Sequence, residues 1–438
     1  MARPLPDNDR PGGVRHWYGR MLDICRMQLY RSSIALFLTT GANALLGLAF
    51  WIAAARLYPP DVVGLGAGGI AALQLVASVG WVGLQFTLLR YVPVAGSRRR
   101  RLVAAVYAAG ALAALAVTAV FVLAFASSLE VPYVADSTLH ALSFGACVAV
   151  WVVASLQDSV LVGIRRSFLA PVENASYGIL KLVLLLALAG SEDPWVILGV
   201  WAGGSALVVL VVNALLFSRL LAADGVAPRL PARRRIARFS AGHTAVALTS
   251  WVPDFLVPLL VLRYLDEASN AYYYAAWTVG ISARLLVMNI ANALTAEGAY
   301  AQRPVVALLR SVVRLNITIL LPVMAVLLVA AGPILQVFGE PYSEEASALL
   351  RLFAVGLVPF AIAILVVAYD RVRERFGAAL VITAVGTTVT LALDVLLIPS
   401  HGITGAGLGW LGGQLAAATV ALVAIMHARR ERQRIPGV

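Results

Sequence analysis

The stretch RRRRLVAAVYAAGALAALAVTAVFVLAF, residues 98–125, decides the fold class of this chain. After its four arginines, residues 102–125 contain no charged side chain. An apolar helix of about 20 residues can cross a bilayer, because its backbone N–H and C=O groups are hydrogen-bonded within the helix. The stretch therefore predicts a membrane-spanning helix that begins at a basic surface.

Apolar runs of this kind recur along all 438 residues. The chain is 61% hydrophobic and 13% charged, with a mean hydropathy of +0.86, whereas soluble domains are roughly 25% charged. No aqueous core could bury so much apolar surface, so we expect an all-α polytopic membrane protein with about twelve transmembrane helices. The predicted spans are residues 33–57, 62–88, 102–126, 138–163, 168–190, 195–218, 239–263, 272–296, 307–331, 347–369, 377–398 and 404–427.

Arginine placement predicts the orientation of these helices. Alternate connections, together with the two terminal segments, contain 27 arginines. The intervening connections are rich in Asp and Glu and have only Arg56 and Arg263, both at helix ends. Because basic residues stay on the cytoplasmic side, both termini are predicted to be cytoplasmic. Topology thus explains the net charge of +12, and we expect no nucleic-acid partner.

Neither the N-terminal segment nor the cysteines and histidines predict processing or a metal centre. Residues 1–32 are basic and lack the early apolar core and cleavage site of a signal peptide, so we expect them to be retained. Cys25 is predicted to be cytoplasmic and Cys147 to lie inside a membrane helix, which excludes a disulfide between them. The five histidines show no metal-ligand spacing.

The longest basic connection, RLLAADGVAPRLPARRRIARF from 219 to 239, divides the chain into two halves of six helices. Their last helices, LGVWAGGSALVVLVVNALL and LGWLGGQLAAATVALVAIM, share a Leu-Gly, a Trp and a Gly-Gly pair, which favours internal duplication. Two such repeats place the substrate path at their interface. We expect a cytoplasmic tail at 1–32, an N-terminal six-helix lobe at 33–218, a basic cytoplasmic linker at 219–238, a C-terminal six-helix lobe at 239–427 and a cytoplasmic tail at 428–438.

The glycine motifs and the single lysine argue against nucleotide chemistry. The G-x-G-x-x-G pattern at 64–69 follows no strand and lies within a membrane helix, so it indicates close helix packing. Gly405, Gly409 and Gly413 stack on one helix face in the same way. Lys181 lies in an apolar helix and not in a P-loop, so the chain is not expected to be an ATPase. Energy must then come from an ion gradient, the membrane potential or downhill substrate movement.

Charged side chains at membrane depth mark candidate functional positions, because each costs about 2.5 to 3.5 kcal/mol without a partner or water. Arg284 lies near the middle of the eighth predicted helix, with Asn289 and Asn292 further toward the cytoplasm. We expect these three side chains to contact the substrate. The alternative is a structural ion pair between Arg284 and Asp254 of the seventh helix.

The densest polar group lies on the fourth and fifth predicted helices, where Asp158, Glu173, Asn174 and Lys181 fall within apolar spans. Asn174 and Lys181 are seven residues apart and share a helix face, while Asp158 and Glu173 reach similar depths. We expect this group to bind substrate or a proton. The alternative is a structural pair of either carboxylate with Lys181 or Arg165.

A second candidate site involves the seventh and eleventh predicted helices. Asp254 lies between Pro253 and Pro258, whose missing N–H groups should bend the helix and free carbonyl oxygens. Thr390 and Asp394 are four residues apart on one face and can complete an oxygen site. We expect this group to bind Na⁺ or a proton for coupling. A bent helix with a paired aspartate explains the same residues.

With these residues in view, the chain resembles the oligosaccharide flippases of the multidrug/oligosaccharidyl-lipid/polysaccharide (MOP) exporter superfamily. The resemblance spans nearly the whole chain and marks the family better than the cargo. It is carried by FWIAAARLYPPDVVGLGAG at 50–68, GIRRSFLAPVENASYGILKL at 163–182, AYYYAAWTVG at 271–280, FGEPYSEEASALLRLFAVGLVP at 338–359 and HGITGAGLGWLGGQ at 401–414.

The resemblance implies two lobes around a central cavity that opens alternately to each side of the bacterial plasma membrane. The implied cargo is an oligosaccharide on a polyprenyl pyrophosphate, flipped to the outer leaflet for cell-surface polysaccharide synthesis. Its implied partners are membrane lipids and the glycosyltransferases or polymerase of the same pathway. Related flippases use cavity arginines for the pyrophosphate, which fits Arg284, although the second helix here has no mid-membrane arginine. A cation site between the seventh, eleventh and twelfth helices of relatives fits Asp254 and Asp394.

Two other functions remain open from the sequence. A drug/cation antiporter of the same superfamily would favour an acidic cavity, and the basic and acidic residues at membrane depth are balanced here. A membrane sugar polymerase or ligase typically needs a large outer loop, and the longest predicted outer loop, 332–346, is short for that role. We therefore expect a transporter with no catalytic residue and no cofactor beyond the coupling ion. Neighbouring glycosyltransferase genes would favour sugar export.

The predicted orientation can be tested by labelling a cysteine placed at Ser343, in a chain whose Cys25 and Cys147 are replaced by serine. Because 332–346 is predicted to be an outer connection, a membrane-impermeant maleimide should label Ser343→Cys in intact cells. Labelling only after the cytoplasmic face is exposed would contradict the helix count or the orientation.

Overall fold

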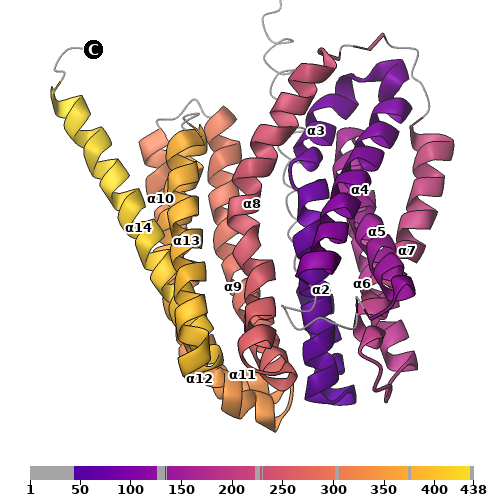
Figure 1. The fold of residues 1–438 in the computed structure, drawn as a ribbon. Coiled ribbons are helices and arrows are strands. Elements are labelled where there is room, and N and C mark those ends of the chain that lie inside the picture. Colours follow the sequence, from indigo (N-terminus) through magenta and orange to yellow (C-terminus); the bar gives the residue numbers. More distant parts are fainter. Residues whose placement is uncertain are drawn as a thin grey trace, which may run out of the picture.

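The computed structural model describes residues 44–125, 134, 136–221, 227–228, 230–300, 305–372 and 376–434, and no strand occurs among them. Their helices are drawn in Figure 1. In chain order they are Ala44–Leu57, α2 (Pro60–Trp81), α3 (Leu84–Tyr91), the short 3-10 helices η1 (Val92–Val94) and η2 (Gly96–Arg98), α4 (Arg99–Ala124), α5 (Thr138–Gly163), α6 (Leu169–Ala187), α7 (Trp195–Leu215), the π-helix η4 (Leu216–Leu220), α8 (Arg233–Tyr264), α9 (Glu267–Tyr300), α10 (Val305–Val329), α11 (Ala331–Gln336), α12 (Glu340–Val372), α13 (Phe376–His401) and α14 (Ile403–Arg434).

Each of the twelve predicted spans corresponds to a helix, or to the pair α2 and α3, in the described part of the chain. Nine described helices are long and apolar enough to cross a membrane. Helix Ala44–Leu57 and the segment Val313–Val329 of α10 are apolar but shorter, and α8 begins with three consecutive arginines. The all-α polytopic architecture predicted from hydropathy is therefore confirmed.

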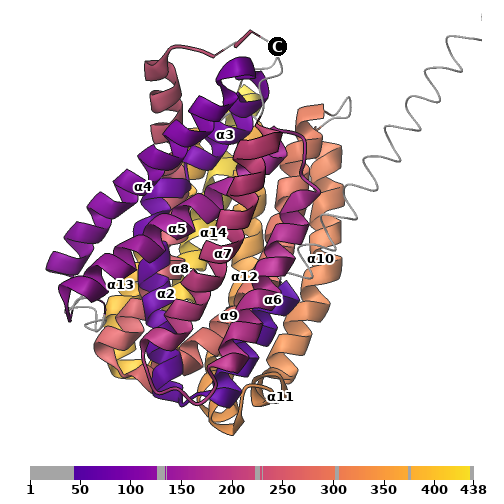
Figure 2. The same ribbon diagram turned by 90° about the vertical axis from the view of Figure 1, so that its right-hand side faces the viewer.

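The helices form two lobes, which Figure 1 shows side by side and Figure 2 shows turned by 90°. The N-lobe, from helix Ala44–Leu57 to η4, lies on the right in Figure 1, and the C-lobe, α8 to α14, lies on the left. Between them α8 runs obliquely, so that its first turns reach toward α3. The buried side chains of both lobes belong largely to one continuous apolar core.

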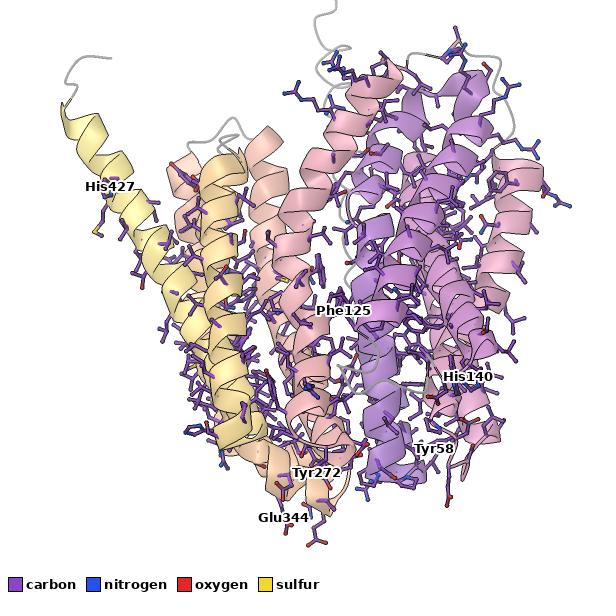
Figure 3. The ribbon with its side chains drawn as sticks, viewed as in Figure 1. Tyr58, Phe125, His140, Tyr272, Glu344 and His427 are labelled. Carbon is purple, nitrogen blue, oxygen red and sulfur yellow. The ribbon has the colours of Figure 1, made fainter. Side chains whose placement is uncertain are left out.

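The two ends of the bundle differ in charge. The basic end, at the top of Figure 3, holds the C-terminal part of α14 with His427. η2 and the first turn of α4 contain four consecutive arginines. The acidic end, at the bottom, holds Glu344 with Tyr58 and Tyr272. The alternation of arginine-rich and acidic connections in the sequence thus becomes a segregation of charge between opposite ends of the fold.

Several helix ends differ from the predicted boundaries. α8 begins within the predicted linker, α14 runs beyond residue 427, and α12 begins at Glu340 inside the predicted 332–346 loop, which also holds α11. Hydropathy detects only the part of a helix that lies in hydrocarbon, whereas polar turns continue into water. The acidic first turn of α12 interacts favourably with the positive end of the helix dipole. The first predicted span starts at residue 33, outside the described residues.

The second predicted span, 62–88, was expected to be one helix, and the structure corrects this to α2 and α3 with a break at Val82 and Gly83. Gly83 is buried where α8 approaches most closely. A Cβ atom at this position would collide with Thr244 and with the backbone of Ser240. The break therefore belongs to the contact between the lobes, which hydropathy cannot reveal.

At the acidic end the lobes are joined by direct hydrogen bonds. The fully buried Asn270 of α9 donates its Nδ2 proton to the carbonyl oxygen of Gly64 at 2.7 Å. Arg56 donates to the carbonyl oxygens of Gln336 and Val337 at 2.6 and 2.8 Å. The rings of Trp51 and Tyr274 lie 4.4 Å apart at the same interface. We call this set of contacts the acidic-end seam.

At the basic end the direct contacts between the lobes run through α3 and α8. Thr87 and Ser240 share a hydrogen bond of 2.5 Å, and Phe239 packs edge-on against Tyr91. Arg90 adds a cation–π contact with the same Phe239 ring at 4.7 Å. The obliquely placed α8 thus provides the C-lobe side of these contacts, and Leu262 near its other end lies against Gly68 of α2.

The acidic-end seam predicts a position-specific effect of glycine substitution. A side chain at Gly64 would collide with the carbonyl group of Glu267, so Gly64→Val should lower the stability of the purified protein by about 1–3 kcal/mol. Gly47→Val is the matched control, because no atom lies within 4 Å of its Cβ position. Thermal unfolding in detergent measures both variants. Equal melting temperatures would show that the lobes do not approach closely at Gly64.

Candidate functional site

The C-lobe contains an ion pair at membrane depth between α9 and α8. Arg284 donates from Nη1 to Oδ1 of Asp254 at 2.8 Å and from Nη2 to Oδ2, so the guanidinium binds the carboxylate with both arms. The two side chains are 13% and 6% exposed. This bidentate geometry is the strongest that arginine and a carboxylate form. The structural pair considered in the sequence is therefore present.

Asp394 of α13 lies beside this pair and has a different environment. It is fully buried, and neither of its carboxylate oxygens has a hydrogen-bond partner. Thr390, one turn earlier on the same helix, is also buried. A buried carboxylate without a donor is costly, so it needs a proton, a cation or a water molecule beside it.

Two glycines of α14 bring the helix backbone against these groups. A Cβ at Gly409 would collide with Oδ1 of Asp394, and a Cβ at Gly413 would collide with Oγ1 of Thr390. The close packing predicted for this glycine series is confirmed. Because glycine has no side chain, this face of α14 lies directly over the polar groups of α13 and keeps other side chains away from them.

These groups enclose one small cavity, the C-lobe cavity, with a volume of about 30 Å³. A cavity of roughly 10–15 Å³ already holds one water molecule, so this one has room for a small ion or water. Its lining includes aromatic residues that sequence patterns did not select. The lining residues are Pro253, Asp254, Val257, Tyr273, Trp277, Gly280, Ile281, Arg284, Phe353, Thr390, Asp394, Ala406 and Trp410.

The N-lobe holds a second polar site, on α5 and α6. Asn174 donates its Nδ2 protons to both carboxylate oxygens of Asp158, at 3.3 and 3.2 Å, and to the carbonyl oxygen of Ala170 at 3.0 Å. Glu173 lies near enough for the charge of Asp158 to act on it, and its buried Oε2 has no hydrogen-bond partner. The structure thus brings together three of the four residues that the sequence grouped here.

Asp158 and Glu173 line a cavity of about 310 Å³, the N-lobe cavity. Trp81, Trp151 and Tyr177 contribute aromatic walls. Trp81 also has a buried Nε1 proton without an acceptor. Two acidic side chains among aromatic rings form a surface that suits a cation, whereas the indole N–H offers a donor to a ligand oxygen.

Lys181 is buried in a cage of aromatic rings and not against a carboxylate. Its Nζ lies 4.0 Å from the ring centre of Trp201, 4.9 Å from Phe50 and 5.0 Å from Tyr177. Ring faces attract an ammonium group through their quadrupoles. The alternative of an ion pair between Lys181 and Asp158 is therefore wrong, because Asn174 is the hydrogen-bond partner of Asp158.

Asn289 belongs to the described lining of neither cavity. Asn289 is exposed on α9, and the side chain of Asn292 lies outside the described residues. Arg165, the other alternative partner for the carboxylates, is exposed at the basic end. The caging rings come from three different helices and have no common sequence spacing, so sequence reasoning did not find them. Among the described residues, no group of three or more His, Cys, Asp or Glu side chains could hold a metal ion.

Comparison with known proteins finds the same arrangement of helices in several solved structures of membrane transporters. The chain is similar to an inward-facing multidrug resistance MATE family transporter of the MOP superfamily, with a TM-score of 0.69, 16% identity and coverage of 90% of this chain and 96% of the other. It is similar to lipid II flippase MurJ in an inward closed conformation, with a TM-score of 0.70, 13% identity and coverage of 90% and 87%. It is also similar to an outward-facing MATE family transporter, with a TM-score of 0.59, 16% identity and coverage of 92% of this chain and 95% of the other.

No protein-family model matches the chain, and no curated protein sequence matches it. The structural likeness nevertheless spans both lobes. The chain therefore has the twelve-helix, two-lobe fold of MOP superfamily transporters.

The Arg284–Asp254 pair predicts a pattern of stabilities in a double-mutant cycle. Arg284→Gln and Asp254→Asn should each destabilise the protein by about 3–5 kcal/mol, because each leaves one buried charge unpaired. The double variant should be more stable than either single variant. Arg351→Gln, at an exposed position on α12, is the control. Additive losses, measured by thermal unfolding in detergent, would contradict a direct pair.

Proposed function

We propose that this protein is an alternating-access transporter that flips oligosaccharides linked to a polyprenyl pyrophosphate. The observation that carries the transport proposal is the two-lobe fold, in which each lobe holds its own buried polar cavity beside a direct lobe-to-lobe interface. Such an interface can open at one end while it closes at the other. The sequence resemblance to oligosaccharide flippases supports the cargo, as does the fold likeness to a lipid II flippase.

The contacts between the lobes support an inward closed state. Asn270, Arg56 and Trp51 join the lobes at the acidic end, and Thr87 and Ser240 join them at the basic end. The TM-scores to a flippase in an inward closed conformation and to an inward-facing MATE transporter, 0.70 and 0.69, exceed the 0.59 to an outward-facing one. With both termini in the cytoplasm of a bacterial cell, the basic end would face the cytoplasmic leaflet. The cargo would then be loaded where glycosyltransferases assemble it, and a polymerase would receive it outside.

Substrate recognition is proposed to involve residues of both lobes. Arg284 would bind the pyrophosphate in another state of the transport cycle, in which the C-lobe cavity is wider and the anion takes the place of Asp254, since both present paired oxygens to the guanidinium. Lys181 adds a positive charge held by rings, and Asn174 orients Asp158. The proposed substrate-contacting residues are Arg284, Lys181, Asn289, Asn292, Asp158, Glu173 and Asn174.

Coupling is proposed to reside in the C-lobe cavity. Arg284 already neutralises Asp254, so the group that would take up Na⁺ or a proton is Asp394, with the Thr390 hydroxyl beside it. A cavity of about 30 Å³ has room for one small ion or water. Binding there would bias the lobes only if affinity differs between the inward-facing and outward-facing states. Asp394 is thus the residue on which ion dependence should rest.

The N-lobe cavity favours a second candidate function, export of an organic cation. Asp158 and Glu173 are both acidic, and Trp151 and Tyr177 provide faces for cation–π contacts. A multidrug resistance transporter is among the proteins with this fold. The two functions differ in the sign of the charge on the cargo, so a transport assay with both kinds of cargo separates them.

The proposed function predicts flipping by the purified chain in proteoliposomes. A fluorescent polyprenyl-pyrophosphate oligosaccharide, read by dithionite quenching, should cross faster than in empty vesicles, and an imposed Na⁺ or pH gradient should accelerate it. Asp394→Asn should abolish the acceleration, because the ion-binding carboxylate is lost. Asp193→Asn at the acidic end is the control.

Uptake of tetraphenylphosphonium without any glycan flipping would reject the flippase proposal in favour of the cation exporter. Flipping that ignores both gradients would reject the coupling role alone.

A further inference from the structure

A cluster of arginines at the basic end of the N-lobe encloses a cavity that neither transport site uses. Arg99, Arg165, Arg166 and Arg219 line it, and its volume is about 440 Å³. They come from the start of α4, the α5–α6 connection and η4, which are far apart in the sequence. The other lining residues are Pro93, Gly163, Ile164 and Leu220, so no acidic side chain belongs to the described lining. We call this cavity the arginine pocket.

The backbone that presents Arg165 and Arg166 has an uncommon conformation. The N–H of Arg166 donates to the carbonyl of Leu161 at 2.9 Å, and the N–H of Arg165 donates to that of Val162 at 3.0 Å. These two bonds form a Schellman motif, whose left-handed position is usually glycine. Here Arg165 occupies it with φ of 60°. An arginine held in this strained conformation is a pointer to a role for its side chain.

Packing fixes the turn that carries these arginines. Gly163 lies against η1, where a Cβ would approach the Cβ of Val92 to 3.0 Å. Arg99 donates from Nε to the carbonyl oxygen of the same Val92 at 3.4 Å. Two walls of the arginine pocket are thereby tied to one residue. The contacts with Val92 therefore hold the α5–α6 connection and the start of α4 together, and with them the arginines that they carry.

An apolar groove of about 340 Å³ begins next to the arginine pocket. It runs between α6 and α7, which lie side by side facing the viewer in Figure 2. Its walls include Leu169, three residues after Arg166, and Leu215, four residues before Arg219. The groove and the pocket thus have walls on the same two chain segments. A basic pocket next to an apolar groove suits a molecule that has a charged head and an apolar chain.

We propose that the arginine pocket binds the phosphate headgroup of an anionic lipid whose hydrocarbon chain lies in the α6–α7 groove. Planar guanidinium groups bind phosphate oxygens with paired hydrogen bonds, and basic pockets at cytoplasmic helix ends suit lipid headgroups. The phosphate can belong to a membrane phospholipid or to a polyprenyl pyrophosphate. The arginine pocket shares no lining residue with either transport cavity, so the headgroup site does not depend on the proposed cargo. The groove shares Glu173 and Val208 with the N-lobe cavity.

The charge arm of the test uses the full-length protein in mild detergent and native mass spectrometry. The probes are cardiolipin and farnesyl pyrophosphate. The double variant Arg165→Gly with Arg166→Ala removes two charges while placing glycine at its preferred left-handed position, so the fold should be retained. Arg100→Ala with Arg101→Ala removes two exposed charges from the same end, outside the pocket. We expect about tenfold weaker binding of at least one probe in the pocket variant and about unchanged binding in the control.

The groove arm uses Val211→Trp, which fills the groove at a side chain that is 71% exposed, and Val120→Trp on α4, at 58% exposure, as its control. Val211→Trp should weaken binding of the same lipid probe but leave binding of inorganic pyrophosphate unchanged. Loss of cardiolipin alone would support the proposal with a phospholipid as ligand, and loss of farnesyl pyrophosphate alone would support it with a polyprenyl pyrophosphate.

Three results would overturn the proposal. Unchanged binding of both probes in the pocket variant would show that the arginine pocket is not a site. An equal loss in the pocket variant and in the Arg100/Arg101 control would show a diffuse basic surface. Equal binding in Val211→Trp and Val120→Trp would remove the groove as the place of the hydrocarbon chain. A melting temperature of the pocket variant at or above that of the unmodified protein excludes misfolding as a cause.

Discussion

The constraint on which this structure depends is the absence of water in the hydrocarbon core of a membrane. Backbone polar groups must then be satisfied within each segment, which makes every span a helix. The same constraint governs side chains, because a charge at that depth needs a partner. Arg284 finds a carboxylate, Lys181 finds three aromatic rings, and Asp158 finds an amide. Each of these three charged groups thus has a different kind of partner.

Asp394 differs from these groups, because neither oxygen of its carboxylate has a hydrogen-bond partner. Its neighbour Asp254 is saturated by Arg284, while Asp394 itself lies under the glycine face of α14 without any donor. Packing has therefore brought two aspartates into one cavity and given them unequal partners. An arrangement of this kind lets one carboxylate hold the helices together while the other stays available to a mobile cation or proton. The two aspartates differ because Arg284 pairs with Asp254 and not with Asp394.

The three polar cavities of this fold lie at different depths or in different lobes. The C-lobe cavity has room for little more than an ion, the N-lobe cavity is ten times larger in the same measure, and the arginine pocket lies at the membrane surface. The acidic-end seam joins the lobes beyond both inner cavities. The proposed coupling site, the larger acidic cavity and the proposed lipid site thus lie in three different places of the fold.

The sequence by itself determined the class of fold, because hydropathy and arginine placement act over whole segments and need no knowledge of tertiary contacts. It also selected the residues at membrane depth, since any charge within an apolar run is conspicuous. Only the tertiary structure decided the partners: Asp254 and Arg284 are 30 residues apart and Asp254 and Asp394 far more, and no spacing rule connects them. The break at Gly83, the cage around Lys181 and the convergence of four arginines likewise arise between helices. Their physical reason is the packing of lobe on lobe and helix on helix, which the periodicity of a single segment does not contain.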